Sequence, residues 1–398
     1  MLMGARFLFT FAVQMQAVVL GWKMYDLTHD PLSLGLIGLS EAIPAVSLAL
    51  YAGYVVDRSK PLVIYRLVLA GSFVSGLVLL FSQLSQVGLG LATQVYFLYL
   101  ASFITGIARG FAQPVIFATV PRIVPREDLQ KASAWMSSAL QIARIAGPAV
   151  GGLVFGWFGS VAAALLVCVA LVLAFVCVVL VRSNPGPVKA HTPRLSLGEE
   201  LLSGLRFVFG HSILLPALSL DMVSVFFGGV TALLPIFADE ILHIGPKGLG
   251  LLRAAPAIGA AFMSFKLTRM NIRAQAGTWL FSSIAGFGIC ILIFGLSQNF
   301  YLSLLALGLS GVFDSVSMII RSSAVQLISP DHLRGRISSV NSIFIASSNE
   351  IGEFESGVAA RFLGTVPAVL FGGSICLITV FLVALFSPSL RKLDLDQV

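Results

Sequence analysis

Charged residues are scarce in this sequence. They make up 11% of its 398 residues, whereas soluble globular domains contain roughly 25%. A chain this poor in charge cannot cover a large surface with hydrated side chains, which excludes an ordinary water-soluble domain. Hydrophobic residues account for 57% of the sequence, and a membrane-spanning helix needs about 20 mostly apolar residues. The composition therefore indicates an integral membrane protein.

Cysteine is also rare, and the histidines lack the spacing of metal ligands. The four cysteines lie in apolar segments rather than in exported loops, so we expect no disulfide framework: Cys168, Cys177, Cys290 and Cys376. The five histidines lie in or near loops. We therefore expect no metal, no other cofactor and no enzymatic activity. A membrane-embedded enzyme, the alternative, would need a reactive group of side chains, and only a cluster of glutamates near residue 350 comes close.

Twelve apolar segments fill most of the chain. They are predicted at 5–24, 32–56, 62–82, 93–119, 130–157, 160–182, 213–241, 247–268, 277–296, 300–328, 337–362 and 366–387. The expected fold is an all-α membrane protein with twelve transmembrane helices in two pseudo-symmetric six-helix halves. The N-terminal half is predicted at 1–182 and the C-terminal half at 212–398.

The segment 183–211 is predicted to be a cytoplasmic linker, because it begins with Pro, Gly and basic residues. Its second part has a capping pair, Ser196 and Glu199. Leucines and Val208 then recur at helical spacing. This pattern predicts a short amphipathic helix on the membrane face. The alternative is that these residues simply begin the seventh span.

The two halves resemble each other in sequence. Residues of the second span align with residues of the eighth: Gly38, Leu39, Ala42, Pro44 and Ala45 with Gly250, Leu251, Ala254, Pro256 and Ala257. In the same way, Gly106 aligns with Gly311 and Pro125 with Pro330. Equal helix counts and matching loop positions support an internal duplication. Many transporters are built from such repeats, with the substrate site near the midplane between them.

Basic residues are unevenly distributed among the connections. Most of the 25 Lys and Arg residues fall in or beside one alternate set of connections, and the positive-inside rule then places both termini in the cytoplasm. The net charge of +7 is thus a topology signal rather than a sign of nucleic-acid binding. Tyr25 and other aromatic residues near the opposite ends are expected to be interfacial anchors.

Charged side chains inside the predicted spans are the strongest functional signal. A charge in hydrocarbon costs several kcal/mol, so it must face protein or a water-filled cavity. The candidates for proton coupling are Glu350, Glu353, Asp314, Asp221 and Glu41. The candidate counter-charges or substrate contacts are Arg109, Arg144 and Arg321. One hypothesis pairs Arg109 in one state with Asp314, which occupies the matching position of the second half. Alternatives include pairing of Asp314 with Arg321 on its own helix, of Glu41 or Asp221 with Arg144, and of the glutamates near residue 350 with Arg321 or Arg253.

Two motifs carry a resemblance to a known superfamily. The stretch from Gly53 through Asp57 and Arg58 to Lys60 resembles the loop signature of the major facilitator superfamily, although Ser59 and Pro61 depart from it. The resemblance implies a cytoplasmic gate formed by Gly53, Asp57 and Arg58. The alternative is a turn with positive-inside charges.

The fifth predicted span contains Gly147, Pro148, Gly151 and Gly152. This resembles the GPxxGG stretch of superfamily antiporters, with Ala143 where the longer form has Gly. Such glycines suit close helix packing in any membrane protein, so an antiport role and plain packing both stay open.

Three further stretches, 124–129, 235–238 and 330–336, resemble the exporter branch that includes enterobactin exporters and macrolide efflux proteins. The expected function is proton-coupled export, by antiport and alternating access, of a small amphipathic molecule such as a drug or siderophore. The expected partners are a small-molecule substrate, protons and membrane lipids, with no nucleic acid. We expect a monomer in the inner membrane. An uncoupled facilitator or importer and a lipid translocator are the alternatives.

Overall fold

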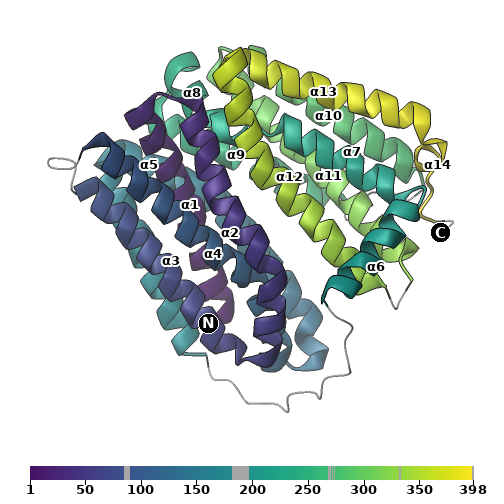
Figure 1. Cartoon of the computed structure of the whole chain (residues 1–398), viewed down its shortest axis with the longest axis horizontal. Coiled ribbons are helices and arrows are strands. Elements are labelled where there is room, and N and C mark those ends of the chain that lie inside the picture. Colours follow the sequence, from purple (N-terminus) through teal and green to yellow (C-terminus); the bar gives the residue numbers. More distant parts are fainter. Residues whose placement is uncertain are drawn as a thin grey trace. The chain divides into compact units, whose positions relative to one another are not determined.

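All regular structure in the described part of the chain is helical. The computed structural model describes residues 1–84, 90–181, 197–267, 270, 272, 274–330 and 333–396, and within them it contains helices and no strand (Figure 1). The expected all-α fold is thereby confirmed. A helix satisfies its backbone hydrogen bonds internally, which is what hydrocarbon requires of a spanning segment.

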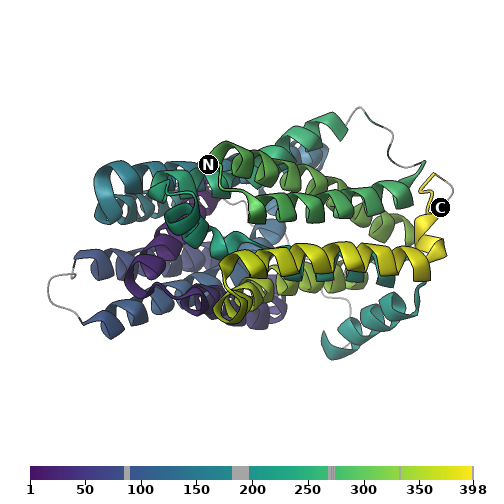
Figure 2. The same ribbon diagram turned by 90° about the horizontal axis from the view of Figure 1, so that it is seen from above.

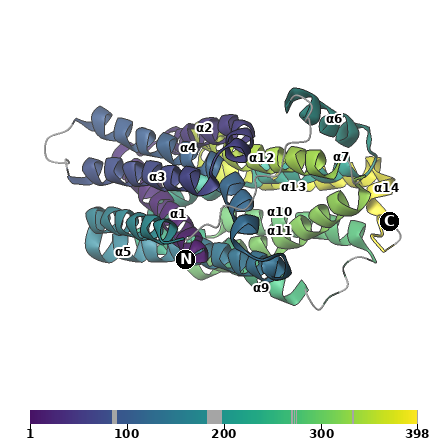
Figure 3. The same ribbon diagram turned by 90° about the horizontal axis from the view of Figure 1, so that it is seen from below.

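The chain divides into two compact units. Unit 1 comprises Met1–Lys189 and Ala232–Ala254. It contains α1 (Leu2–Thr28), α2 (Pro31–Arg58), α3 (Pro61–Leu84), α4 (Leu91–Ile123), η1 (Arg126–Asp128), α5 (Leu129–Val179), α8 (Leu234–Ile236), η3 (Phe237–Ile241) and the first part of α9 (Gly245–Leu267). Within this unit α1 runs beside α5, and α3 contacts both α4 and α5 (Figure 3).

Unit 2 comprises Ala190–Thr231 and Ala255–Val398. Its helices, besides the second part of α9, are α6 (Leu197–Gly210), α7 (Leu214–Gly228), α10 (Ala276–Leu296), α11 (Phe300–Ile328), α12 (Arg334–Leu363), α13 (Thr365–Phe386) and α14 (Pro388–Arg391). The yellow α13 packs against α7, α10 and α12 (Figure 2). The expected halves, 1–182 and 212–398, are drawn from the sequence repeat and have other bounds than these two units. They stay a prediction.

Ten helical segments among the described residues are long and apolar enough to cross a membrane. One of them, α5, has 51 residues and is broken at Gly159, whose φ of 84° suits glycine. This break falls between the predicted spans 130–157 and 160–182. The 30-residue α12 is not among the ten and is rich in charged residues. The count of twelve spans stays a prediction, because it requires two spans in α5 and one in α12.

The seventh predicted span, 213–241, is not one regular helix. The helix α7 ends at Gly228, and Gly229 is extended (φ −73°, ψ 109°). A 3-10 turn, η2 (Thr231–Leu233), then leads into α8 and the π-helix η3. A Gly-Gly pair weakens the helix, and Pro235 has no backbone N–H to continue one. The Ser356 hydroxyl donates a 2.8 Å hydrogen bond to the Gly229 carbonyl, which satisfies a group that the break exposes.

Glycines set the closest helix contacts within each unit. A Cβ on Gly106 would lie 2.2 Å from the carbonyl oxygen of Glu41 and 2.7 Å from Cγ of Pro44, so α4 touches α2 there. A Cβ on Gly311 would lie 1.9 Å from the carbonyl oxygen of Pro256, so α11 touches α9 there. The two contacts join residues that align in the sequence repeat. The duplication is therefore visible as an equivalent packing contact in each unit.

The helix α6 is separate from α7 and packs within unit 2. Val208 is fully buried in a cluster with Leu214, Leu218 and Val340. The structure thus has a helix at Leu197–Gly210, Ser196 of the capping pair lies outside the described residues, and the predicted linker 183–211 stays a prediction. The position of α6 on the membrane face stays a prediction.

His211 caps the start of α7. Its Nδ1 accepts hydrogen bonds from the backbone N–H groups of Ile213 and Leu214, at 3.2 and 3.3 Å. Burial lowers the pKa of His211 below its ordinary value. The neutral ring is therefore the form that the folded protein prefers, and protonation of Nδ1 would remove the acceptor.

Thermal stability should fall as pH is lowered, because the folded state binds this proton less readily than the unfolded state. The contribution of His211 is fully present above the ordinary histidine pKa of about 6.5 and is lost as pH falls through the lowered folded-state pKa. His211→Asn, whose side-chain oxygen accepts the same bonds without titrating, should flatten the dependence of unfolding temperature on pH. His243→Asn, at an exposed left-handed position, serves as the control and should keep the wild-type slope. Equal slopes in all three proteins would contradict the assignment.

Candidate functional site

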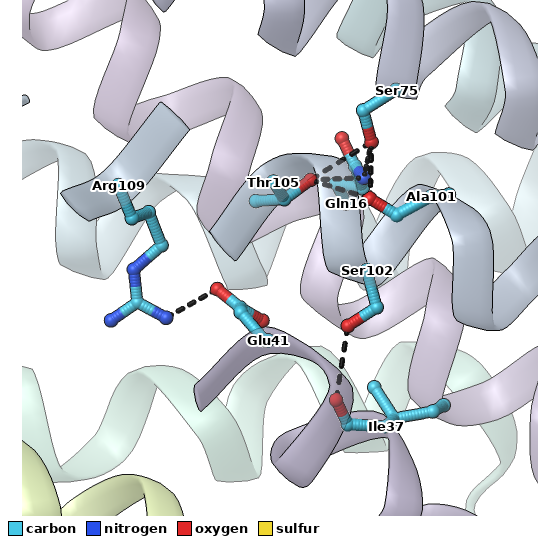
Figure 4. Close-up of polar contacts among 8 residues, drawn as sticks. All are labelled: Gln16, Ile37, Glu41, Ser75, Ala101, Ser102, Thr105 and Arg109. Carbon is cyan, nitrogen blue, oxygen red and sulfur yellow. Dashed lines mark hydrogen bonds and ion pairs between the residues drawn. The ribbon is translucent and has the colours of Figure 1, made fainter. Parts of the chain in front are cut away.

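Two charged residues of unit 1 form an ion pair between α2 and α4. Nη1 of Arg109 donates to Oε1 of Glu41 (Figure 4). Gly106 lies one turn before Arg109, and its lack of a side chain lets α4 approach the Glu41 backbone. The Glu41 side chain is 14% exposed and that of Arg109 is 41% exposed. The guanidinium of this pair is therefore the more exposed of its two charged groups.

A buried hydrogen-bond network holds α4 in register behind this pair. Nε2 of Gln16 donates to Ser75 Oγ at 2.8 Å and to Thr105 Oγ1 at 3.0 Å (Figure 4). One turn before Thr105 on α4, Ser102 Oγ donates to the Ile37 carbonyl at 3.0 Å. These bonds join α4 to α1, α3 and α2, and they fix the rotation that points Arg109 toward Glu41.

Unit 2 contains a more deeply buried pair. Nη2 of Arg321 on α11 lies 2.7 Å from Oδ1 of Asp221 on α7, and the two side chains are 5% and 6% exposed. Ser317 Oγ donates to the same oxygen at 3.4 Å. Arg321 thus pairs with Asp221 rather than with Asp314 two turns away on its own helix.

Asp221 and Asp314 line the same small cavity. Its other lining residues include Ser224, Ser283 and Ser317, and its volume is ≈ 10 Å³, which is near the lower limit for one water molecule. The ionised carboxylates of Asp221 and Asp314 also repel each other. Two carboxylates therefore line a water-sized space inside unit 2, and one of them, Asp221, also pairs with Arg321.

The glutamates of α12 flank its contact with α7. A Cβ on Gly352 would lie 2.7 Å from the Phe226 carbonyl oxygen, and Ser356 bonds to Gly229, so this face of α12 packs against α7. Glu353 and Glu355 are both half-buried. The side chain of Glu350 lies outside the described residues, so its predicted partnership with Glu353 stays a prediction.

The residues of the GPxxGG stretch line two helix contacts in unit 1. A Cβ on Gly147 would lie 2.7 Å from Cβ of Gln14, and one on Gly151 would lie 2.9 Å from Cγ of Met15, both on α1. A Cβ on Gly152 would lie 2.7 Å from Cα of Gly250 on α9. Pro148 lies inside α5, and its carbonyl oxygen faces Gly250. The stretch packs α5 against both α1 and the first part of α9.

The predicted gate is described only in part. Arg58 lies exposed in the last turn of α2, and a Cβ on Gly53 would meet no described atom within 4 Å. The side chain of Asp57 lies outside the described residues. The gate therefore stays a prediction. Arg144, on α5, is exposed on the surface of unit 1, and Glu41 pairs with Arg109 rather than with it.

Two polar contacts in unit 1 were not predicted. The Tyr25 hydroxyl donates to Oε1 of Glu240, and Tyr25 is only 2% exposed. Its interpretation as an interfacial anchor is therefore wrong, because it is buried against η3. Nη1 of Arg253 donates to the Ala17 carbonyl at 2.6 Å. No local sequence pattern signals either contact, since each joins α1 to a segment far along the chain.

The repeat places opposite charges at equivalent positions. By the alignment that matches Pro44 with Pro256 and Gly106 with Gly311, Glu41 corresponds to Arg253 and Arg109 to Asp314. The duplicated helices have therefore kept a charge at each position while inverting its sign. The proposed pairing of Arg109 with Asp314 stays a hypothesis, since the two residues belong to different units.

Comparison with known proteins identifies the family. A family model described as "Transmembrane secretion effector" matches residues 2–398. The chain belongs to this family. Enterobactin exporter EntS of Shigella boydii serotype 18 is 24% identical over 302 residues, which cover 74% of this chain and 70% of that protein. The expected resemblance to the exporter branch of the major facilitator superfamily is confirmed.

Solved structures support the same fold. A POT family transporter in complex with 5-aminolevulinic acid has a TM-score of 0.76 at 14% identity, covering 98% of this chain and 96% of that one. A D-xylose-proton symporter has a TM-score of 0.74 at 12% identity, covering 98% of both chains. At such identities the likeness shows the fold alone. Together with the family and the apolar helices, it makes this protein an integral membrane transporter of the major facilitator type.

Removal of one partner from the Asp221–Arg321 pair should be strongly destabilising. Asp221→Asn leaves the Arg321 charge buried without its carboxylate, at a cost of about 3–5 kcal/mol. The double variant Asp221→Leu/Arg321→Met removes both charges and should recover most of that loss. Thermal unfolding of the purified transporter in detergent, followed by intrinsic fluorescence, measures the stability of the single and the double variant. Glu41→Gln provides the comparison and should cost less, because Arg109 is partly open to solvent. A double variant no more stable than Asp221→Asn would refute this account.

Proposed function

We propose that this transporter exports a small amphipathic molecule, such as a drug or siderophore, in exchange for protons. The observation that carries the proposal is the cavity of unit 2. Asp221 and Asp314 both line it, and two neighbouring carboxylates repel each other unless one of them binds a proton. Because net charge is costly inside a membrane, this arrangement favours a site that binds and releases a proton during transport.

The direction of transport is supported by the exporter relatives. EntS is named as an exporter of enterobactin, and the family is described as a secretion effector. The half-exposed Arg109 beside Glu41 in unit 1 offers a cation to an acidic or hydrogen-bonding group of the cargo. Arg144 is a second candidate contact.

Coupling arises in this proposal because the cargo and the proton compete for the same carboxylates. In the proposed cycle, cargo binding from the cytoplasm displaces a proton from the carboxylates Asp221, Asp314, Glu350, Glu353 and Glu41, taken as a set. Alternating access between the predicted halves 1–182 and 212–398, joined by the linker 183–211, then exposes the cargo to the other side. Gly53, Asp57 and Arg58 form the proposed gate on the cytoplasmic side, where the positive-inside rule also places both termini.

Proton release on cargo binding tests the proposal directly. A panel of drugs and siderophores is added, one compound at a time, to purified transporter in weakly buffered detergent solution. Addition of a compound that binds should release protons. Asp314→Asn, Glu350→Gln and Glu353→Gln should each reduce this release, and loss in one of them identifies the coupling carboxylate. Glu127→Gln, in the exposed connection between α4 and α5, is the matched control and should release as many protons as the wild type.

The alternatives predict other results. Cargo binding without proton release in the wild type would rule out antiport and leave an uncoupled facilitator or importer. Transport in proteoliposomes that ignores an imposed pH gradient would lead to the same conclusion. Movement of labelled phospholipid between leaflets, with no response to soluble cargo, would indicate a lipid translocator instead.

A further inference from the structure

Unit 1 contains a buried group of hydrogen-bond donors at the first turns of α1 and α3. Arg6 is 9% exposed and Tyr65 is 0% exposed. Nε of Arg6 and the hydroxyl of Tyr65 are buried without a hydrogen-bond partner. The hydrogen bond that the structure gives to the Arg6 guanidinium runs from Nη2 to Oε1 of Gln113 at 3.4 Å. It is long, and its acceptor is a neutral amide.

The electrostatic environment of these donors is positive. Arg6 interacts with Tyr65 and is repelled by Arg144. The first turns of α1 and α3 contain no acidic residue, and helix N-termini themselves carry partial positive charge. A guanidinium buried in this setting is costly unless an anion accompanies it.

We propose that a chloride ion binds between Arg6 and Tyr65. Chloride accepts hydrogen bonds from N–H and O–H groups and needs neither side chain to change its protonation. A water molecule could accept the same bonds, but it would add no negative charge beside Arg6. The site is enclosed, since Tyr65 is fully buried. A single-atom anion suits such a space better than a tetrahedral oxyanion.

Bound chloride would tie together the elements that supply its ligands. Arg6 comes from α1 and Tyr65 from α3, and Arg6 also donates to Gln113 of α4. A ligand that binds the folded state alone stabilises it increasingly with concentration. The proposed site therefore makes the stability of this transporter depend on chloride, whatever its cargo.

Thermal unfolding at constant ionic strength tests the site. The unfolding temperature of the wild type in detergent should rise as sodium gluconate is replaced by sodium chloride. Above the dissociation constant, each tenfold increase should add a similar increment. Tyr65→Phe keeps the ring and removes the hydroxyl, and Arg6→Gln removes the charge; both should lose most of the chloride response. Tyr99→Phe, which removes a hydroxyl that already donates to the Ser33 carbonyl at 3.3 Å, is the matched control and should keep it.

Three results would overturn the proposal. The first is equal unfolding temperatures of the wild type in chloride and gluconate, which would leave only water at the site. The second is stabilisation by phosphate but not by chloride, which would point to an oxyanion or a lipid headgroup. The third is the absence of an anomalous peak at the site in bromide-soaked crystals of the wild type, a test that does not require the variants to fold. An anomalous peak between Arg6 Nε and the Tyr65 hydroxyl supports chloride binding, and its absence contradicts it.

Discussion

Neutralisation of charge inside hydrocarbon is the constraint on which the rest of this structure depends. The chain has few charged residues, and four of the interior ones form two ion pairs between helices. Asp221 and Arg321 join α7 to α11, and Glu41 and Arg109 join α2 to α4. Because an unpaired buried charge is more costly than either pair, each pair fixes which helices must be neighbours.

The pairs depend in turn on how closely the helices approach. Gly106 lets α4 touch the backbone of α2 one turn from Arg109, and Gly311 lets α11 touch α9 at the equivalent place. The hydrogen bonds of Gln16 and Ser102 then fix the rotation of α4. Small residues and short polar side chains therefore position the charged ones. This division of labour is expected where lipid offers no hydrophobic force between helices.

The sequence predicts positions along helices better than partners between them. Apolar length and interruptions predicted the all-helical fold and the break near Gly159, because both are properties of a short stretch of chain. The repeat correctly marked Pro44 with Gly106 and Pro256 with Gly311 as equivalent. The partner of Arg321 could not be chosen from sequence, because it depends on the rotation of α7 relative to α11. The contact of Tyr25 with Glu240 and the end of α7 at Gly228 likewise depend on tertiary packing.

The composition of unit 1 has a consequence for how the protein is made. Tyr25, Ala17 and Gly152 find their partners in Glu240, Arg253 and Gly250, which the ribosome adds long after the first helices have left it. Segments of a chain generally begin to fold in the order of their synthesis. The early helices of this protein must therefore insert into the membrane before the residues that pack against part of their surface have been synthesised. A nascent chain that stops at the linker lacks the residues that complete unit 1, so insertion of the later spans finishes the fold of the earlier ones.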